Sequence, residues 1–433
     1  MARVRPFAAV RYASVGTDLT PVTAPPYDVI SPAERAALLK KDPHNVVALE
    51  LADGPLDPEV AGNRYETAAN TWNAWRERNI LTTEEQPALY VLEQRYVLGG
   101  RPIRRKAVIA EVALEPFSAG VILPHERTLP KALGDRFELT RATGANFSQV
   151  FGLFEDAAGQ TDAVFQHVTA MRPDATAVDA DGVESTLWVV TDPELISVFT
   201  TALADKPVFI ADGHHRYTTA LAYRDLRRAQ AEESGVTIGA DPAYDFVLMA
   251  LVNMEDPDLV VLPTHRVADA ATALDAEAFL AALEPLFLTE QISPEDVSDA
   301  LDENGAPAFI AKLRGDDRIM RLTLRADVDL ESAISASRSS AWKHLDVAVL
   351  QELILDPLLD IHPDRPESLD RLTFVKDART ALSMSSEHDV VFLLRSTRME
   401  QLRSVALAGE TMPQKSTYFY PKLLSGLVMR SAE

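Results

Sequence analysis

The stretch from Val208 to Leu226 constrains the fold of this chain more than any other, because it specifies three local structures in succession. Its first four residues, Val208 to Ala211, are apolar and predict a buried strand. Asp212-Gly213 follows and is a turn signal. The residues after Arg216 are good helix formers with an apolar stripe. The sequence therefore predicts a buried strand, a tight loop and the beginning of a helix.

The predicted loop has the chemistry of an anion site. The first amide groups of a helix have no partner within the helix, and the helix dipole favours negative charge at that end. Arg216 adds a planar donor that matches phosphate oxygens. Together with Gly213, His214 and His215 it forms a candidate phosphate-binding loop, which Asp212 precedes.

The composition limits what such a site can bind. The chain has 433 residues, enough for two or three packed units, and 47% of them are hydrophobic. Its net charge of −23 argues against nucleic acid and anionic membranes, because both attract basic surfaces. We expect neither as a partner. We expect instead a small-molecule pocket that is locally basic or rich in amides, in a chain that could form a homodimer.

The absence of cysteine excludes disulfides, thiolate catalysis and zinc–cysteine sites. The N-terminus lacks the long apolar segment of a secretory signal, and no stretch is apolar enough to span a membrane. These features predict a cytoplasmic protein.

A proline-braced loop near the N-terminus is the next candidate. Pro25-Pro26 fixes an extended backbone and would hold Tyr27 and Asp28 rigidly. Ser31, with Glu34 three residues later, forms the capping box of a short helix. Asp28 either solvates a turn or contributes to a site, and the sequence leaves both open.

Two further polar stretches complete the candidate set. His125-Glu126 follows a predicted strand, and open sheets place ligand-contacting groups where strands exit. The charged residues after it include Lys131 and Arg136. The C-terminal tail interleaves polar and aromatic residues around Lys415, which predicts that it packs back onto the body.

The order of predicted elements indicates a mixed α+β fold. We expect a main α/β domain at residues 1–268, a small α+β insert at 269–330, and C-terminal helices and strands at 331–433 that pack onto the main domain. Within them, Asn45 to Leu51 predicts a strand and Glu331 to Leu359 a helix.

Four interpretations of the Asp212–Arg216 loop compete. A plain turn would not need two histidines and an arginine after a buried strand, because burying them costs desolvation. A metal site could use His214, His125 and Asp212, but adjacent histidines rarely bind one ion. A nucleophilic hydrolase is less favoured, because the chain has neither a cysteine nor a Gly-x-Ser-x-Gly elbow. Phosphate or nucleotide binding fits best, although no P-loop or Rossmann fingerprint is present.

Five motifs together carry a resemblance to a known family, the DUF1015 family, over nearly the whole chain. They are Pro25-Pro26-Tyr27-Asp28-Val29-Ile30-Ser31, His125-Glu126-x-Thr128, Asp135-Arg136, Asp212-Gly213-His214-His215-Arg216-Tyr217 and Met412-Pro413-x-Lys415-Ser416-Thr417.

The Asp212–Arg216 motif is also similar to the nucleotide-binding box of the ParB/sulfiredoxin superfamily, which includes kinases of free L-serine. This resemblance implies a ParB/sulfiredoxin-like nucleotide-binding core, elaborated by further mixed-sheet and helical segments. Sulfiredoxin chemistry itself needs a cysteine and is excluded.

The implied reaction is phosphoryl transfer from ATP, ADP or pyrophosphate, with Mg²⁺, to a small hydroxyl substrate such as free L-serine, giving O-phosphoserine. Alternatives are a non-catalytic nucleotide-binding switch and a metal-dependent phosphohydrolase. The resemblance implies that the donor phosphates bind Gly213, His214, His215 and Arg216, with additional cations at Lys131, Arg136 and Lys415. It implies a general base at Glu126 beside His125, and Asp212 as a further catalytic group. It implies substrate contacts at Tyr27, Asp28 and Thr128. The metal ligands are left open.

Overall fold

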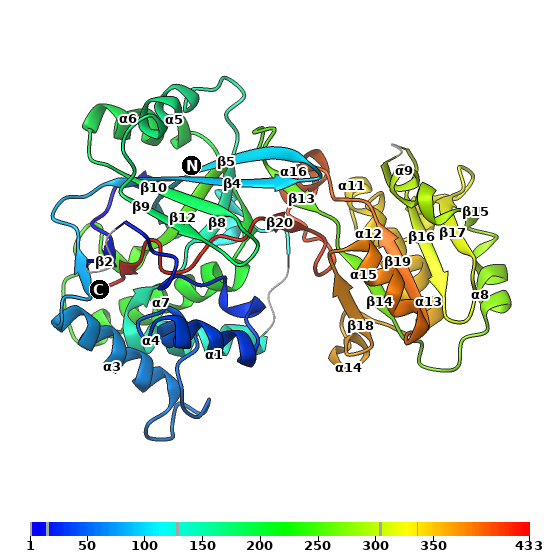
Figure 1. The fold of residues 1–433 in the computed structure, drawn as a ribbon, viewed down its shortest axis with the longest axis horizontal. Helices are drawn as coiled ribbons and strands as arrows, with labels where there is room; N and C mark the ends of the chain where they lie inside the picture. The colour runs from blue at the N-terminus through cyan, green and yellow to red at the C-terminus, as the bar shows by residue number, and fades with distance from the viewer. Residues whose placement is uncertain (1, 14–16, 127–129, 303–304, 336) are drawn as a thin grey trace. The chain divides into compact units, whose positions relative to one another are not determined.

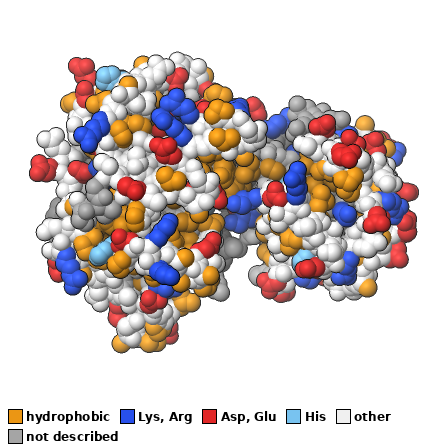
Figure 2. Space-filling view, viewed as in Figure 1, with side chains coloured by type: hydrophobic (Ala, Val, Ile, Leu, Met, Phe, Trp, Pro, Cys, Tyr) orange, Lys and Arg blue, Asp and Glu red, His pale blue; other side chains and the backbone are white. Residues whose placement is uncertain are grey.

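The chain forms two compact units. The structure is a computed structural model and describes residues 2–13, 17–126, 130–302, 305–335 and 337–433. Unit 1 comprises Met1–Pro124, Thr128–Val260 and Pro421–Glu433, and unit 2 comprises His125–Arg127 and Val261–Tyr420. The three-part division at residues 268 and 330 stays a prediction. Figure 2 shows acidic and basic side chains interspersed on the visible surface of this acidic chain.

Unit 1 is built around a mixed nine-stranded sheet in the order β6-β11-β8-β12-β5-β4-β10-β9, with β1 paired to β5 (Figure 1). Its strands are β1 (Val4–Arg5), β4 (Leu89–Leu98), β5 (Arg101–Ala113), β6 (Ile122–Leu123), β8 (Val150–Phe154), β9 (Ala175–Val178), β10 (Glu184–Val190), β11 (Val208–Asp212) and β12 (Phe246–Asn253). Two short pairs accompany it: β2 (Val10–Tyr12) with β3 (Leu81–Thr83), and β7 (Ala145–Asn146) with β21 (Arg430–Ser431).

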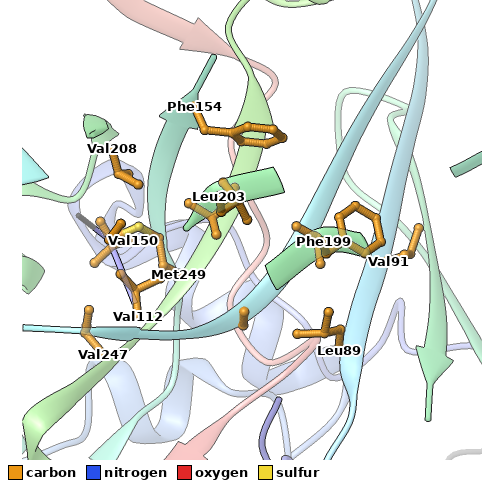
Figure 3. Close-up of a cluster of buried hydrophobic side chains, with 14 of the residues drawn as sticks. Leu89, Val91, Val112, Val150, Phe154, Phe199, Leu203, Val208, Val247 and Met249 are labelled. Carbon is orange, nitrogen blue, oxygen red and sulfur yellow. The ribbon is translucent and has the colours of Figure 1, made fainter. Parts of the chain in front are cut away.

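Helices cover this sheet. In Figure 1, α5 and α6 lie on one side of it, whereas α3, α4 and α7 gather on the other. The helices of unit 1 are α1 (Pro32–Lys41), α2 (Val47–Glu50), α3 (Arg64–Glu77), α4 (Pro130–Thr143), α5 (Asp162–Thr169), α6 (Pro193–Leu203) and α7 (His214–Glu233). Figure 3 shows part of the core, where Phe199 and Leu203 of α6 meet strand residues such as Val91 and Met249. This apolar contact fixes the strands that lead to the candidate site.

Unit 2 contains a second, six-stranded antiparallel sheet in the order β15-β17-β16-β19-β14-β18. Its strands are β14 (His265–Ala268), β15 (Phe287–Ile292), β16 (Ala308–Leu313), β17 (Ile319–Leu324), β18 (Leu372–Val375) and β19 (Val390–Leu394). A separate ribbon pairs β13 (Val260–Leu262) with β20 (Tyr418–Tyr420). The helices are α8 (Ala276–Leu283), α9 (Val297–Asp302), α10 (Leu330–Ala333), α11 (Ser340–Lys343), α12 (Asp346–Leu350), α13 (Asp356–Leu359), α14 (Pro366–Leu369), α15 (Ala378–Ser383) and α16 (Met399–Leu407).

These two sheets with helices confirm a mixed α+β architecture. The capping box is present as well: the Ser31 side chain accepts from the Glu34 N–H, and the Glu34 carboxylate accepts from the Ser31 N–H. In the part of the chain that the structure describes, no helix is both long and apolar enough to cross a membrane.

Two sequence expectations were wrong. The strand expected at residues 45–51 is absent, because Val47–Glu50 form helix α2. Just before this helix, the Asn45 side chain accepts from the Val47 N–H and donates to the Pro21 and Thr23 carbonyls, which fixes a local turn. The expected helix at 331–359 is broken into short segments. Near the end of this range, the Asp356 N–H bonds to the Gln351 C=O, five residues earlier, as in a π-helix. The next residue, Pro357, has no N–H with which to continue an α-helical pattern.

The first residue of β14 makes the stability of unit 2 dependent on pH. Burial lowers the pKa of His265 to about 4, with Arg266 acting in the same direction and Asp377 against it. In the unfolded chain this histidine titrates near pH 6.5, so the unfolded state gains the proton first as the pH falls. We expect the contribution of His265 to the free energy of unfolding to fall by about 2 kcal/mol between pH 7 and pH 5. A urea titration at both pH values should show this loss in the wild type and not in His265→Gln. An equal loss in the variant would contradict it.

Candidate functional site

The strand, loop and helix around Asp212 form as the sequence predicts. Strand β11 ends at Asp212, Gly213 precedes the helix, and α7 begins at His214. The pairing of β11 with β8 shifts register between Ile210 and Asp212. Such an irregularity re-aims the side chain that follows it, which here is Asp212. Within α7, the Tyr217 N–H bonds to the Gly213 C=O. The amide groups of the residues just before Tyr217 precede this bonding pattern, so they have no acceptor within the helix.

Gly213 is required at this turn for two reasons. Its φ is +86°, a conformation that side-chain-bearing residues rarely adopt. A Cβ there would also lie 2.9 Å from two guanidinium nitrogens of Arg216. The Arg216 side chain thus folds back over the glycine, at the beginning of the helix.

Asp212 has two cationic neighbours. Its Oδ2 lies 3.4 Å from Nη2 of Arg216 and 3.5 Å from Nζ of Lys422. Arg216 also donates from Nη1 to the backbone carbonyl of Gln149. The side chains of all three charged residues are partly exposed. The carboxylate therefore holds two positive groups at the N-terminal end of α7, where a bound anion would benefit from both.

The backbone near Lys422 is held by buried polar side chains of unit 1. Arg105 donates to the Pro421 carbonyl at 2.6 Å, Gln94 to the Lys422 carbonyl at 3.1 Å, and Gln149 to the Leu424 carbonyl at 3.3 Å. Burial lowers the pKa of Arg105 to about 10, and Asp212 is among the charges that act against this. The C-terminal segment of unit 1 is thus fixed in place beside Asp212.

Several buried polar atoms in these same residues and in α7 have no hydrogen-bond partner among the residues that the structure describes. They are Nη1 of Arg105, Oε1 of Gln149, and the hydroxyl groups of Thr218 and Thr219. Buried polar atoms are nearly always hydrogen-bonded, so water or a ligand is expected to satisfy them. Hydrogen-bonding atoms near the beginning of α7 are therefore available to water or a ligand.

The proline-braced loop belongs to the same neighbourhood. Tyr27 lies in a single helical turn, Tyr27–Val29, and the guanidinium of Arg136 is 4.0 Å from the centre of its ring. Burial raises the pKa of Tyr27 to about 12, and both Arg136 and Arg216 are close enough to act against that rise. Asp28 is exposed. The structure therefore brings Tyr27 and Arg216 within electrostatic range of each other.

Arg136 is buried in an ionic cluster and is not presented to solvent. Only 5% of its side chain is exposed, and it donates to Oε2 of Glu50 at 2.9 Å and to Oδ2 of Asp135 at 2.8 Å. Its pKa is raised, because Glu50 and Asp135 more than offset the effect of burial. It also donates to the Glu50 backbone carbonyl at 3.1 Å. Arg136 is thus engaged by Glu50 and Asp135, and its guanidinium packs on the Tyr27 ring.

His125, Glu126 and Lys415 lie together in unit 2. The Lys415 N–H donates to Oε1 of Glu126 at 3.2 Å, and Nε2 of His125 lies 2.9 Å from the Thr417 hydroxyl. Lys415 has a φ of +55°, and its side chain is exposed. These contacts fix the 412–417 loop on Glu126. Thr128 lies outside the described residues, and of Lys131 only the backbone, in α4, is described.

The family model annotated with the description "Protein of unknown function (DUF1015)" matches residues 4–348. The chain belongs to the DUF1015 family. This match confirms the family resemblance, and four of the five motifs lie within the matched residues. A search among curated proteins found no match.

Three solved structures are similar to this DUF1015 protein. A conserved hypothetical protein from Pyrococcus furiosus is 13% identical, with a TM-score of 0.33, over 72% of this chain and 90% of that one. A free serine kinase in complex with AMP is 14% identical, with a TM-score of 0.33, over 72% and 86%. SbnI from Staphylococcus aureus, with a C-terminal truncation, is 12% identical, with a TM-score of 0.35, over 74% and 86%. Scores this low carry no argument about function.

Sequence reasoning missed three residues near this candidate site: Lys422, Arg105 and Gln149. Lys422 stands in the aromatic tail, where its neighbours Tyr420 and Pro421 signalled a packed segment but not an ion pair. Arg105 belongs to a short basic run that resembles a solvated strand end, yet only 1% of it is exposed. Among the described residues, no group of three or more His, Asp or Glu side chains could hold a metal ion.

Proposed function

We propose that this protein is a phosphotransferase whose nucleotide or pyrophosphate donor binds at the Asp212–Arg216 loop. The observation that carries the proposal is the pairing of Asp212 with both Arg216 and Lys422 at the beginning of α7. In a chain of net charge −23, two cations beside a helix N-terminus form a local site for phosphate.

The chemistry at this site would be positioning and charge neutralisation. Phosphoryl transfer breaks the bond between the terminal phosphorus and the leaving oxygen and forms a bond to the acceptor oxygen, while the acceptor hydroxyl loses its proton. Arg216 and Lys422 would neutralise donor oxygens, and Asp212 would keep both cations in place. The Gly213 turn lets a phosphate approach the backbone without a side chain in the way.

The acceptor we propose is a small molecule with a hydroxyl group, with free L-serine as the first candidate. Tyr27 and Asp28 support a polar acceptor, because the loop that carries them lies near Arg216 and Asp28 is exposed. Mg²⁺ would share the phosphate charge when bound. Of the carboxylates Asp28 and Asp212, we propose Asp28 as the contact for Mg²⁺, since Asp212 is already paired with Arg216 and Lys422. The roles of Glu126, His125, Lys131, Lys415 and Thr128 stay predictions.

Turnover tests this proposal. The full chain would be incubated with Mg²⁺, L-serine and, in separate reactions, ATP, ADP and pyrophosphate, and O-phosphoserine would be measured by ³¹P NMR. We expect product with at least one donor. The absence of O-phosphoserine with all three would overturn the serine kinase assignment. Nucleotide binding without turnover would favour a switch, and release of inorganic phosphate alone would favour a phosphohydrolase.

Lys422 should contribute to donor binding. Replacing it by methionine keeps much of its length but removes the charge beside Asp212. We expect about a tenfold loss of donor affinity, because one partly exposed charged contact is worth about 1.5 kcal/mol. Isothermal titration calorimetry would measure it. Lys40→Met is the matched control, since Lys40 is exposed in the last turn of α1. Equal affinities for the two variants would contradict the role of Lys422.

A further inference from the structure

A cavity of about 1210 Å³ lies in unit 2, where strands β18 and β19 end and β14 begins. Every residue that lines it belongs to unit 2, and none belongs to the Asp212–Arg216 loop. Its volume is sufficient for an organic ligand of ordinary size. Its apolar lining includes Pro263, Val297, Leu301, Ala378, Leu382 and Leu394.

A buried hydrogen-bond donor lines this cavity. His265 is 1% exposed, and its Nδ1 accepts a hydrogen bond from the Leu394 N–H at 3.1 Å. A neutral imidazole that accepts at Nδ1 carries its proton on Nε2. His265 thus places a fixed N–H donor among the residues that line the cavity.

Two of the carboxylates around the cavity are already committed. Asp346 receives two hydrogen bonds from Arg395, at 2.6 and 2.7 Å. Asp377 caps helix α15 by accepting from the N–H and the hydroxyl of Thr380, both at 2.7 Å. The Arg395 guanidinium thus offsets the charge of Asp346, whereas Asp377 keeps its negative charge and accepts from Thr380 through Oδ1.

Three cations remain at the edge of the cavity. Arg379 and Arg398 are exposed, and Arg379 lies within electrostatic range of Asp377, whose pKa is lowered by its hydrogen bonds with Thr380 and, to a smaller extent, by Arg379. Lys376 donates to the neutral hydroxyl of Tyr418 at 3.1 Å. The other lining carboxylates, Glu295 and Glu400, lie in the first turns of helices, where the helix dipole stabilises their charge.

We propose that this cavity binds a small organic anion that also has an apolar part. The anionic head, a carboxylate, sulfonate or phosphate, would accept from Nε2 of His265 and pair with Arg379 and Arg398. The apolar part would contact Leu301, Leu382 and their neighbours. This site is independent of the proposed phosphotransfer, because unit 2 supplies all of its lining residues.

The probe for this site is 1-anilinonaphthalene-8-sulfonate, an aromatic sulfonate that fluoresces in apolar surroundings. We expect the full-length protein to bind one equivalent and the double variant Arg379→Ala/Arg398→Ala to bind at least tenfold more weakly. Both arginines are exposed, so the double variant should fold normally. The control is Arg325→Ala/Arg365→Ala, which removes two solvent-exposed arginines of unit 2 that do not line the cavity.

Hydrogen exchange locates the bound probe. We expect protection at the beginning of β14, in α15 and at the junction of β19 with α16. His265→Phe removes the donor while keeping a ring of similar size, and it should weaken binding if it folds. Equal affinities of the two double variants, or protection confined to unit 1, would overturn the proposal.

Discussion

Replacing Arg216 by alanine should weaken the binding of ATP, ADP or pyrophosphate about a hundredfold. The guanidinium lies over Gly213 at the beginning of α7 and pairs with Asp212. Its removal would take away two charge-assisted hydrogen bonds to donor oxygens, a loss of about 3 kcal/mol. It would also remove one of the positive groups beside Asp212, so that the carboxylate would repel the phosphates more strongly. Isothermal titration calorimetry with each donor would measure the change.

The matched control for this variant is Arg227→Ala, on the same helix. Arg227 lies 11 residues further along α7, about 16 Å away along the helix axis. Its guanidinium contacts Tyr223 and Glu433. This control should bind donors like the wild type. Arg216→Lys keeps the charge but loses the planar fork, so an intermediate affinity is expected. A folded Arg216→Ala protein with wild-type affinity would eliminate the loop as a phosphate site.

Local structure could be predicted wherever neighbouring residues determine it. The apolar run before Asp212, the turn at Gly213 and the helix formers after Arg216 act within a few residues of one another, and the structure has all three. The capping box at Ser31 was predicted correctly for the same reason. Asn45 shows the limit of this reasoning. Its side chain bonds to carbonyls more than twenty residues away in sequence, and this fixes a turn that periodicity alone cannot reveal.

Long-range partners could not be predicted, because they depend on which strands are neighbours. Lys422 reaches Asp212 across 210 positions, and Arg105 reaches the Pro421 carbonyl across 316. Both contacts require the sheet order that brings β5, β8 and β11 near the C-terminal segment. The additional cations expected from the sequence were Lys131, Arg136 and Lys415, whereas the structure shows Lys422 paired with Asp212. Lys415 instead donates its backbone N–H to Glu126 in unit 2.

The candidate residues thus divide into two sets with different physical settings. Asp212, Arg216 and Lys422 are partly exposed and can still rearrange around a ligand. Arg136, Glu50 and Asp135 are tied to one another, and the guanidinium of Arg136 packs on Tyr27. We propose a binding role for the first set only, since the second set holds the loop that carries Tyr27.

Replacing Arg136 by methionine should destabilise unit 1 by about 3 to 5 kcal/mol. Glu50 is 5% exposed, so the variant would leave a buried carboxylate without its cation. The Tyr27 ring would also lose the guanidinium 4.0 Å from its centre. Urea unfolding followed by the fluorescence of Trp72 and Trp75, which lie in α3 beside α4, would measure the loss.

Two variants test whether the unpaired charge causes this loss. Arg141→Met removes an arginine from the same helix whose side chain is 49% exposed and pairs with Glu138 at the surface, so it should cost less than about 1 kcal/mol. Glu50→Gln/Arg136→Met removes both buried charges and should recover much of the lost stability, because a neutral amide can be buried at lower cost. If Arg136→Met were no less stable than Arg141→Met, the buried pair would not hold this part of the fold. If the double variant were as unstable as the single one, packing of Arg136 on Tyr27, and not charge, would account for the loss.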